Sequence, residues 1–164
     1  MAGLSGCTPM HDWREVRGVN APFVVLLPAK PASLSRDINL DGTRLTMTMT
    51  AAEVDGVTFA IGSAKLPDQM APQAALNAMK TALVKNIRGK IRHEKTLPAG
   101  ANTTASIEIE AIGAPGRQSG GQPTILFGRF AEKDRYIYQA VVTGPEKSVV
   151  RESVDTFFTS FKLN

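Results

Sequence analysis

Few residues of this chain have side chains that commonly act as nucleophiles, general bases or metal ligands. One cysteine, Cys7, and two histidines, His11 and His93, are spread over 164 residues. A pair formed by Cys7 and His11 would lie in a polar leader, without a third group to orient it, and the chain has no Gly-x-Ser-x-Gly motif. The sequence therefore predicts neither a nucleophilic catalytic site nor a thiolate metal cluster.

Two other stretches begin like ligand-binding loops but lack a defining part. Residues 37–42 read Asp-Ile-Asn-Leu-Asp-Gly, yet the glutamate of a calcium loop does not follow at the required spacing. Residues 113–121 are rich in glycine, but they contain no Gly-Lys-Ser/Thr and do not lead into a predicted helix. We expect a hairpin at the first stretch, a flexible connection at the second, and no metal or cofactor at either.

The residues around Cys7 carry most of the functional information. Leu4, Ser5 and Gly6 precede it, so an aliphatic residue and two small residues lead into the cysteine. This pattern resembles the lipobox of bacterial lipoproteins, and the resemblance implies that Cys7 is the lipid attachment residue. Each buried methylene of an acyl chain contributes about 0.8 kcal/mol, so two or more chains hold a protein at a membrane for long times.

The same resemblance implies a location in the cell envelope. Residues 1–6 would be the remaining end of a signal peptide, residues 7–21 a tether, and residues 22–164 a single domain facing the periplasm. Thr8 stands where some lipoproteins carry an aspartate that retains them in the inner membrane, which favours the outer membrane. The alternative for a lone cysteine is a small buried hydrophobic residue.

The composition is that of an ordinary globular protein. Hydrophobic residues make up 43% of the chain and charged residues 21%, and 164 residues suffice for one domain with a substantial core. Fourteen glycines and ten prolines indicate many turns, which favours a sheet-rich fold. The net charge of +4 is compatible with anionic partners but too small to indicate nucleic-acid binding. No apolar run reaches the roughly 18 residues of a membrane-spanning helix.

Alternating residue patterns and turn signals predict most of the strands. Asp41-Gly42 and Asp55-Gly56 are typical of two-residue hairpin turns, in which both positions need positive φ. Between them, Leu45, Met47 and Met49 alternate with threonines, as in a strand with one buried face. The apolar run at residues 23–27 predicts a strand that is buried on both faces. Further strands are expected at residues 33–40, 57–66, 91–97, 106–112, 124–132 and 135–143.

Apolar residues at three- and four-residue steps predict helices over residues 68–87 and 145–161. Gly89 is expected to stop the first helix, and Pro145 to lie in the first turn of the second. We therefore expect an α+β fold, an antiparallel β-sheet of about seven to eight strands with two helices packed on it.

The sequence also predicts which way some strand residues face and where the last hairpin turns. In residues 106–112, Ile107 and Ile109 are expected to face the core, while Glu108 and Glu110 face solvent. Trp13 is expected to pack on the edge of the domain in a first strand or plug. The last hairpin is expected to turn at Lys133-Asp134.

Three segments resemble a known fold group. They are APFVVLLPAKP near the start, LFGRFAEKDRYIYQAVVTG, and VDTFFTSFKL at the end. They are similar to the PsbP-like group of α/β/α sandwiches, in which a strand ending in proline opens the domain and a helix ending in Ser-Phe closes it. The resemblance spans about residues 13–163 and implies the fold alone, because members of the group bind different partners and share no catalytic residues that match this chain.

A run of basic residues follows the middle of the first predicted helix. In one interpretation its charges complement the helix dipole and block edge-to-edge strand pairing. In the other it contacts anionic lipid headgroups or another envelope polyanion. Aromatic residues do not interleave with the run, so nucleic acid is not expected. The candidate contact residues are Lys80, Lys85, Arg88, Lys90, Arg92 and Lys95.

These observations favour a membrane-anchored envelope lipoprotein that is not an enzyme. We expect its domain to bind an envelope protein or an anionic surface. The alternative is a carrier or sensor of a small apolar ligand, which requires a closed apolar cavity between the sheet and a helix. An enzyme would require a cleft that displaces the pKa of a carboxyl group such as Asp37 or Glu108.

Overall fold

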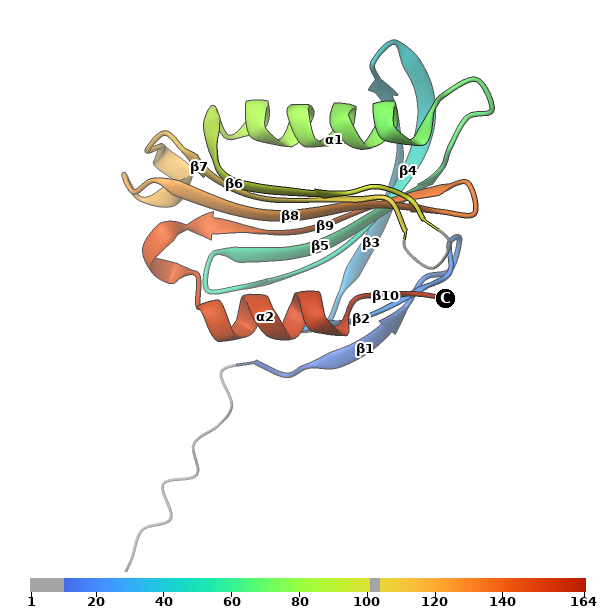
Figure 1. The fold of residues 1–164 in the computed structure, drawn as a ribbon. Coiled ribbons are helices and arrows are strands. Elements are labelled where there is room, and N and C mark those ends of the chain that lie inside the picture. Colours follow the sequence, from blue (N-terminus) through green and yellow to red (C-terminus); the bar gives the residue numbers. More distant parts are fainter. Residues whose placement is uncertain (1–10, 101–103) are drawn as a thin grey trace, which may run out of the picture.

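The computed structural model describes residues 11–100 and 104–164, so Cys7 lies outside the described residues. In the described part, ten strands and two α-helices form three layers (Figure 1). The middle layer is a seven-stranded sheet. This is the α+β fold predicted from the sequence, with two helices on an antiparallel sheet.

All neighbouring strands of the large sheet are antiparallel. Their order across the sheet is β3-β4-β5-β9-β8-β7-β6, so β3 and β6 are the two edges. The strands are β3 (Ala32–Leu40), β4 (Thr43–Val54), β5 (Val57–Lys65), β6 (Gly89–Leu97), β7 (Ser106–Gly113), β8 (Thr124–Lys133) and β9 (Tyr136–Pro145).

A single helix covers one face of this sheet, and a layer made of a helix and a small sheet covers the other. Helix α1 (Pro72–Asn86) packs on one face, and α2 (Arg151–Ser160) lies on the other beside a three-stranded sheet (Figure 1). The small sheet has the order β1-β2-β10. Its strands are β1 (Arg14–Arg17), β2 (Phe23–Leu27) and β10 (Lys162–Leu163), and two 3₁₀ turns lie at Arg117–Ser119 and Glu146–Ser148.

Each face of the large sheet has its own hydrophobic core. On the α1 side, Leu76 and Met79 pack with Ile107, Ile109 and Leu126. On the α2 side, apolar residues of β2, β5, β8, β9 and α2 contribute to the second core; its buried aromatic members are Phe23, Phe59, Phe127, Tyr138, Phe157 and Phe161. Burial raises the pKa of the Tyr138 phenol to about 12, with smaller contributions from Tyr136 and Asp134, so this side chain stays neutral in the core.

The turn signals of the first half of the chain are confirmed. Asp41-Gly42 has φ values of 51° and 84°, and Asp55-Gly56 has 53° and 79°. The side chain of Asn39 accepts a hydrogen bond of 2.8 Å from the Gly42 amide, which places residues 37–42 in a hairpin, as expected. The last hairpin turns at Asp134-Arg135, one residue later than predicted, because Lys133 still pairs with Tyr136.

The predicted ends of both helices need correction. Helix α1 begins at Pro72 instead of residue 68, and the left-handed residue after it is Arg88, with φ of 48°, instead of Gly89. Helix α2 begins at Arg151 instead of residue 145, because Pro145 still belongs to β9, where it pairs with Thr124.

Strand β2 also differs from the prediction. Its burial alternates, so Phe23, Val25 and Leu27 are buried, while Val24 and Leu26 are partly exposed. The strand lies in the small sheet, whose inner face alone meets the core, and it is therefore not buried on both faces. β1 lies within the range 7–21 that the sequence assigned to the tether, and it pairs along its length with β2.

Both cores are filled by side chains. Ala75, Leu76 and Met79 of α1 are at most 2% exposed, and Val25, Leu27 and Phe157 of the opposite core are not exposed at all. The larger hollows among the described residues open on the molecular surface. The carrier hypothesis therefore gains no support from the described part of the chain. Within the same residues, neither α-helix has the length and apolar character to cross a bilayer.

The close contact between β7 and the end of α1 gives a test of this packing. A Cβ atom on Gly113 would lie 2.3 Å from the backbone oxygen of Ile87, so Gly113→Ala must displace the end of α1. We expect a loss of about 2 kcal/mol in the free energy of unfolding, measured by denaturant titration. Gly116→Ala is the control, because its Cβ would meet nothing nearer than 4.0 Å. Equal stability of the two variants would contradict this contact.

Candidate binding site

The leader meets the domain on the α2 side of the large sheet. His11, the first described residue, packs edge-on against Trp13 and Phe59, with ring centroids 5.4 and 6.1 Å away. Trp13 itself lies 6.0 Å from Phe59 in a similar edge-on contact. The prediction that Trp13 packs on the domain edge is confirmed, and Cys7 is four residues from His11 along the chain.

Two of the six predicted basic contact residues have an acidic partner. Lys80 on α1 forms a 2.6 Å ion pair with Glu94 on β6, so the acidic residue within the run neutralises one of its cations. Arg92 lies at a β-bulge of β6 and has Glu146 at 3.9 Å. The other four residues are exposed at the end of α1 and along β6, and they are Lys85, Arg88, Lys90 and Lys95.

Strand β6 places Glu94 on the α1 face of the sheet and its two lysines, Lys90 and Lys95, on the α2 face. Glu94 pairs with Ile109, whose side chain belongs to the α1 core, whereas His93 and Lys95 pair with Glu110 and Glu108. The bulge and the charged side chains hinder pairing of this edge strand with another strand. The position of β6 at the edge fits the interpretation of edge protection, and contact with an anionic surface stays a prediction.

The carboxylates of β7 tie α2 to the sheet. Glu110 accepts a 2.7 Å hydrogen bond from Arg151, the first residue of α2, and has His93 Nε2 at 3.6 Å. The Arg151 guanidinium also lies 4.9 Å from the centre of the Phe127 ring. Only 9% of the Glu110 side chain is exposed, so the expectation that it faces solvent is wrong.

A second contact of the same kind holds the other end of α2. Arg129 on β8 donates hydrogen bonds of 3.0 Å to Glu108 and to the backbone oxygen of Phe158. Its guanidinium lies 5.2 Å from the centre of the Phe158 ring. These charges have a structural role, because each links the helix to the large sheet.

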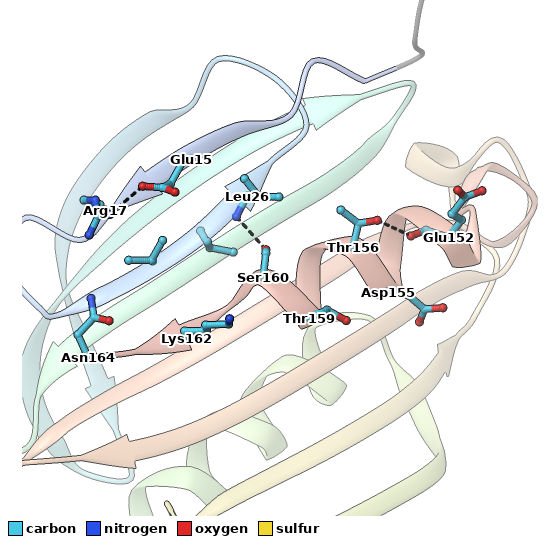
Figure 2. A pocket seen from close by; sticks show the side chains of 12 residues that line it. Glu15, Arg17, Leu26, Glu152, Asp155, Thr156, Thr159, Ser160, Lys162 and Asn164 are labelled. Atoms are coloured by element: carbon cyan, nitrogen blue, oxygen red, sulfur yellow. Dashed lines mark hydrogen bonds and ion pairs between the residues drawn. The ribbon is translucent and has the colours of Figure 1, made fainter.

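A long groove lies on the outer side of α2 and the small sheet. Figure 2 shows β1 with Glu15 and Arg17 on one side, and α2 with Glu152, Asp155 and Thr159 on the other. The partly exposed Val24 and Leu26 of β2 add apolar surface between them, and the groove measures about 960 Å³. This hollow is the candidate binding site.

The short last strand explains why the groove exists. β10 pairs with β2 only at Lys162–Val24 and Leu163–Phe23, so the rest of this edge of β2 has no strand beside it. The Leu26 amide instead donates a 2.8 Å hydrogen bond to Ser160 Oγ, which itself donates to the Phe157 carbonyl (Figure 2). The Ser160 hydroxyl is fully engaged and serves as a structural cap.

The charges of the groove are unequal along its length. Glu15 forms a 2.9 Å ion pair with Arg17, which neutralises both. Within the described part of the chain, the exposed carboxylates of Glu152 and Asp155 have no ion-pair partner. Lys162 also lines the groove and has no ion-pair partner among the described residues, so the five charges leave an excess of one negative charge. The groove therefore offers apolar surface next to the carboxylates of α2, a combination that suits a basic, partly apolar segment.

Comparisons with known proteins support the architecture. No protein-family model and no curated protein sequence matches this chain. The solution structure of cyanobacterial PsbP (CyanoP) from Synechocystis sp. PCC 6803 superposes with a TM-score of 0.60 over 100% of this chain and 99% of that one, at 7% sequence identity. The fold is PsbP-like.

A weaker likeness concerns a protein of unknown function, PA94 from Pseudomonas aeruginosa. It covers 87% of this chain and 89% of that one, with a TM-score of 0.43 and 11% identity. The PsbP-like fold confirms the resemblance drawn from the three sequence segments, while at 7% identity it shows the architecture alone.

Sequence reasoning missed both the groove and the inward-facing Glu110. The groove combines β1 and β2, near the start of the chain, with α2 and β10, at its end. Val24 and Leu26 look like core residues because the run at 23–27 contains no polar residue. The chain neighbours of Glu110 in β7 face the α1 core, so the Glu110 side chain lies on the other face of the sheet. Only its contact with Arg151 shows that this other face is also covered.

The ion pair between the buried carboxylate of Glu110 and the exposed Arg151 predicts an unequal response to mutation. In a double-mutant cycle with Glu110→Gln and Arg151→Gln, we expect a coupling of about 1–2 kcal/mol in the free energy of unfolding. The matched cycle with Glu15→Gln and Arg17→Gln should give less than about 0.5 kcal/mol, because both side chains are more than half exposed. Equal couplings would show that Arg151 does not hold α2 to the sheet.

Proposed function

We propose that this protein is a lipid-anchored, non-catalytic binding module of a bacterial cell envelope. In this proposal Cys7 carries the lipid, the domain faces the periplasm, and the groove along α2 takes a basic extended segment of an envelope protein. The observation that carries it is the pairing of apolar surface from Val24 and Leu26 with the free carboxylates of Glu152 and Asp155.

The length of the leader supports a function close to the membrane. His11 lies four positions after Cys7. An extended chain spans at most about 3.5 Å per residue, so the two residues are at most about 14 Å apart. His11 packs on Phe59 under the α2 layer. A lipid on Cys7 would thus hold this side of the domain near the bilayer surface, in the outer membrane by the argument from Thr8.

Charge complementarity supports a protein segment over a polyanion at the groove. The whole chain carries a net charge of +4, yet the groove is lined by three carboxylates, Glu15, Glu152 and Asp155, against two cations, Arg17 and Lys162. A lysine or arginine of the partner would meet these carboxylates, and apolar side chains next to it would cover Val24 and Leu26.

The anchor is tested on the protein produced in a bacterial host with a complete lipoprotein signal peptide. We expect a mature chain that begins at Cys7, carries a diacylglyceryl group and an acylated amine, and sediments with membranes. The Cys7→Ser variant should lose the lipid and remain in the soluble fraction, since acyl chains supply the attachment. Intact-protein mass spectrometry gives the answer, and an unmodified Cys7 or cleavage at another residue would refute the anchor.

The groove is tested by crosslinking in native envelopes. A photocrosslinking amino acid placed at Thr159, which is exposed on α2, should capture a lysine- or arginine-containing segment of one protein, identified by peptide mass spectrometry. We expect Glu152→Lys combined with Asp155→Lys to reduce this product about tenfold, because like charges then oppose the partner.

The matched control reverses two exposed carboxylates outside the groove, Glu53 and Asp68, to lysine. It should leave the crosslinked product unchanged. If both double variants reduce the product equally, net charge alone governs the capture and the groove is not the binding site. A captured segment without basic residues would contradict the proposed charge complementarity.

A further inference from the structure

A second hollow lies at one end of the sandwich, where four segments meet. They are the β4–β5 turn at Gly56, the end of α1 at Asn86 to Arg88, the β7–β8 connection at Ala114 to Ser119, and the end of β9. The hollow measures about 640 Å³. It is separate from the groove along α2, with which it shares no lining residue.

The charges in this hollow are all positive. Arg88 and Arg117 line it, and no aspartate or glutamate does. Among the described residues, neither guanidinium has an ion-pair partner. By contrast, five other arginines have one: Arg14, Arg17, Arg92, Arg129 and Arg151. An anion bound in this hollow would be attracted by both guanidinium charges.

Neutral donors line the same space. The hydroxyl groups of Thr58 and Thr124 and the amide of Asn86 make no hydrogen bond within the described part of the chain. By contrast, Thr143 donates to the Ile125 carbonyl, and Ser119 donates to the oxygens of Gly116 and Gln122. The free groups are therefore available to a bound oxyanion.

The backbone at Arg88 adds a second observation. Its φ of 48° lies in the left-handed region, which glycine or asparagine adopts more readily than arginine, and Gly89 follows it directly. An arginine here can offset the negative end of the α1 dipole. Arg117 lies in a 3₁₀ turn of the β7–β8 connection and has no such role, so the helix dipole explains only one of the two cations.

We propose that this hollow binds a phosphate group, held between Arg88 and Arg117 and supported by the hydroxyls of Thr58 and Thr124. Guanidinium groups match phosphate through paired N–H donors, and a site without carboxylates does not repel it. The phosphate can come from a soluble phosphoester or from a lipid headgroup, and the two sources are distinguished below.

The position of the leader makes the lipid source relevant. His11 lines a narrow gap with Asp55 and Val57, the two neighbours of Gly56, which lines the phosphate hollow. The β4–β5 turn thus connects the two spaces along the chain, with the leader on the α2 side of the sheet and the hollow at the end of α1. The lipid source, though not the phosphate site itself, rests on the proposed anchoring through Cys7.

The site is tested with the full chain carrying Cys7→Ser, which prevents oxidation of the thiol without touching the hollow. Inorganic phosphate and glycerol 3-phosphate are titrated separately, and amide chemical shifts are followed by NMR. We expect saturable shifts at Thr58, Arg88 and Arg117. Arg88→Asn combined with Arg117→Gln should weaken binding at least about tenfold, because both charge-assisted hydrogen bonds are lost. Asparagine is chosen at residue 88 because it tolerates a left-handed backbone.

The matched control is Arg36→Gln with Arg44→Gln, which removes the same charge from exposed positions on the β3–β4 hairpin. Thermal melts of both double variants show whether each is folded. Phosphate binding that only the Arg88/Arg117 variant loses supports the site. Absence of saturable shifts, or equal weakening in both variants, would overturn it.

Vesicles distinguish the two sources of phosphate. The same chain is sedimented with vesicles of phosphatidylglycerol and phosphatidylcholine in equal parts, and with phosphatidylcholine alone. Binding to the first that soluble phosphate displaces, and that the Arg88/Arg117 variant lacks, assigns the site to a headgroup. Binding of soluble phosphate without vesicle binding assigns it to a phosphoester. Failure of the NMR titration leaves the anchor and the groove unaffected, because those are measured at Cys7 and at Thr159.

Discussion

The fold depends on the burial of both faces of its central strands. Along β9, Ile137 and Val141 face the core under α1, while Tyr138, Ala140 and Val142 face the core under α2. A sheet that is apolar on both sides cannot be stable with one side in water, so both covers are required. The covers are different in kind, because one is a single helix and the other combines a helix with a three-stranded sheet. On the α2 side of β7, the ion pairs of Glu108 with Arg129 and of Glu110 with Arg151 join the sheet to its cover.

Local signals in the sequence predicted those parts of the fold that depend on a few neighbouring residues. Asp41-Gly42 and Asp55-Gly56 identify their turns because the backbone there needs positive φ whatever packs around it. The turn at Asp134-Arg135 has no glycine, and its position is fixed by the pairing of Lys133 with Tyr136. Likewise, Pro145 and Glu146 suit a first helical turn, yet the pairing of β9 with β8 continues to Pro145 and delays α2.

The candidate sites were less predictable, since their residues come together only in the folded chain. The groove joins β1 and β2 to a helix that begins more than 120 positions later. Arg88 was a candidate for contact with anions, and the proposed phosphate hollow retains it for that role, but its companion Arg117 belongs to a glycine-rich stretch expected to be a mere connection. Within the basic run, Lys80 pairs with Glu94 on the α1 side, while Lys90 and Lys95 lie on the α2 face of β6, and the sequence alone did not show this division.

The two edges of the large sheet matter when many copies share one membrane. A lipid anchor would confine molecules to a surface, where they meet far more often than in free solution and in fewer orientations. At one edge, β6 has a bulge at Arg92 and exposed cations, and at the other β3 presents Arg36 and Asp37 among exposed residues. Two such edges resist joining into a continuous sheet. Crowded copies would therefore stay separate, and the groove along α2 would remain open to a different protein.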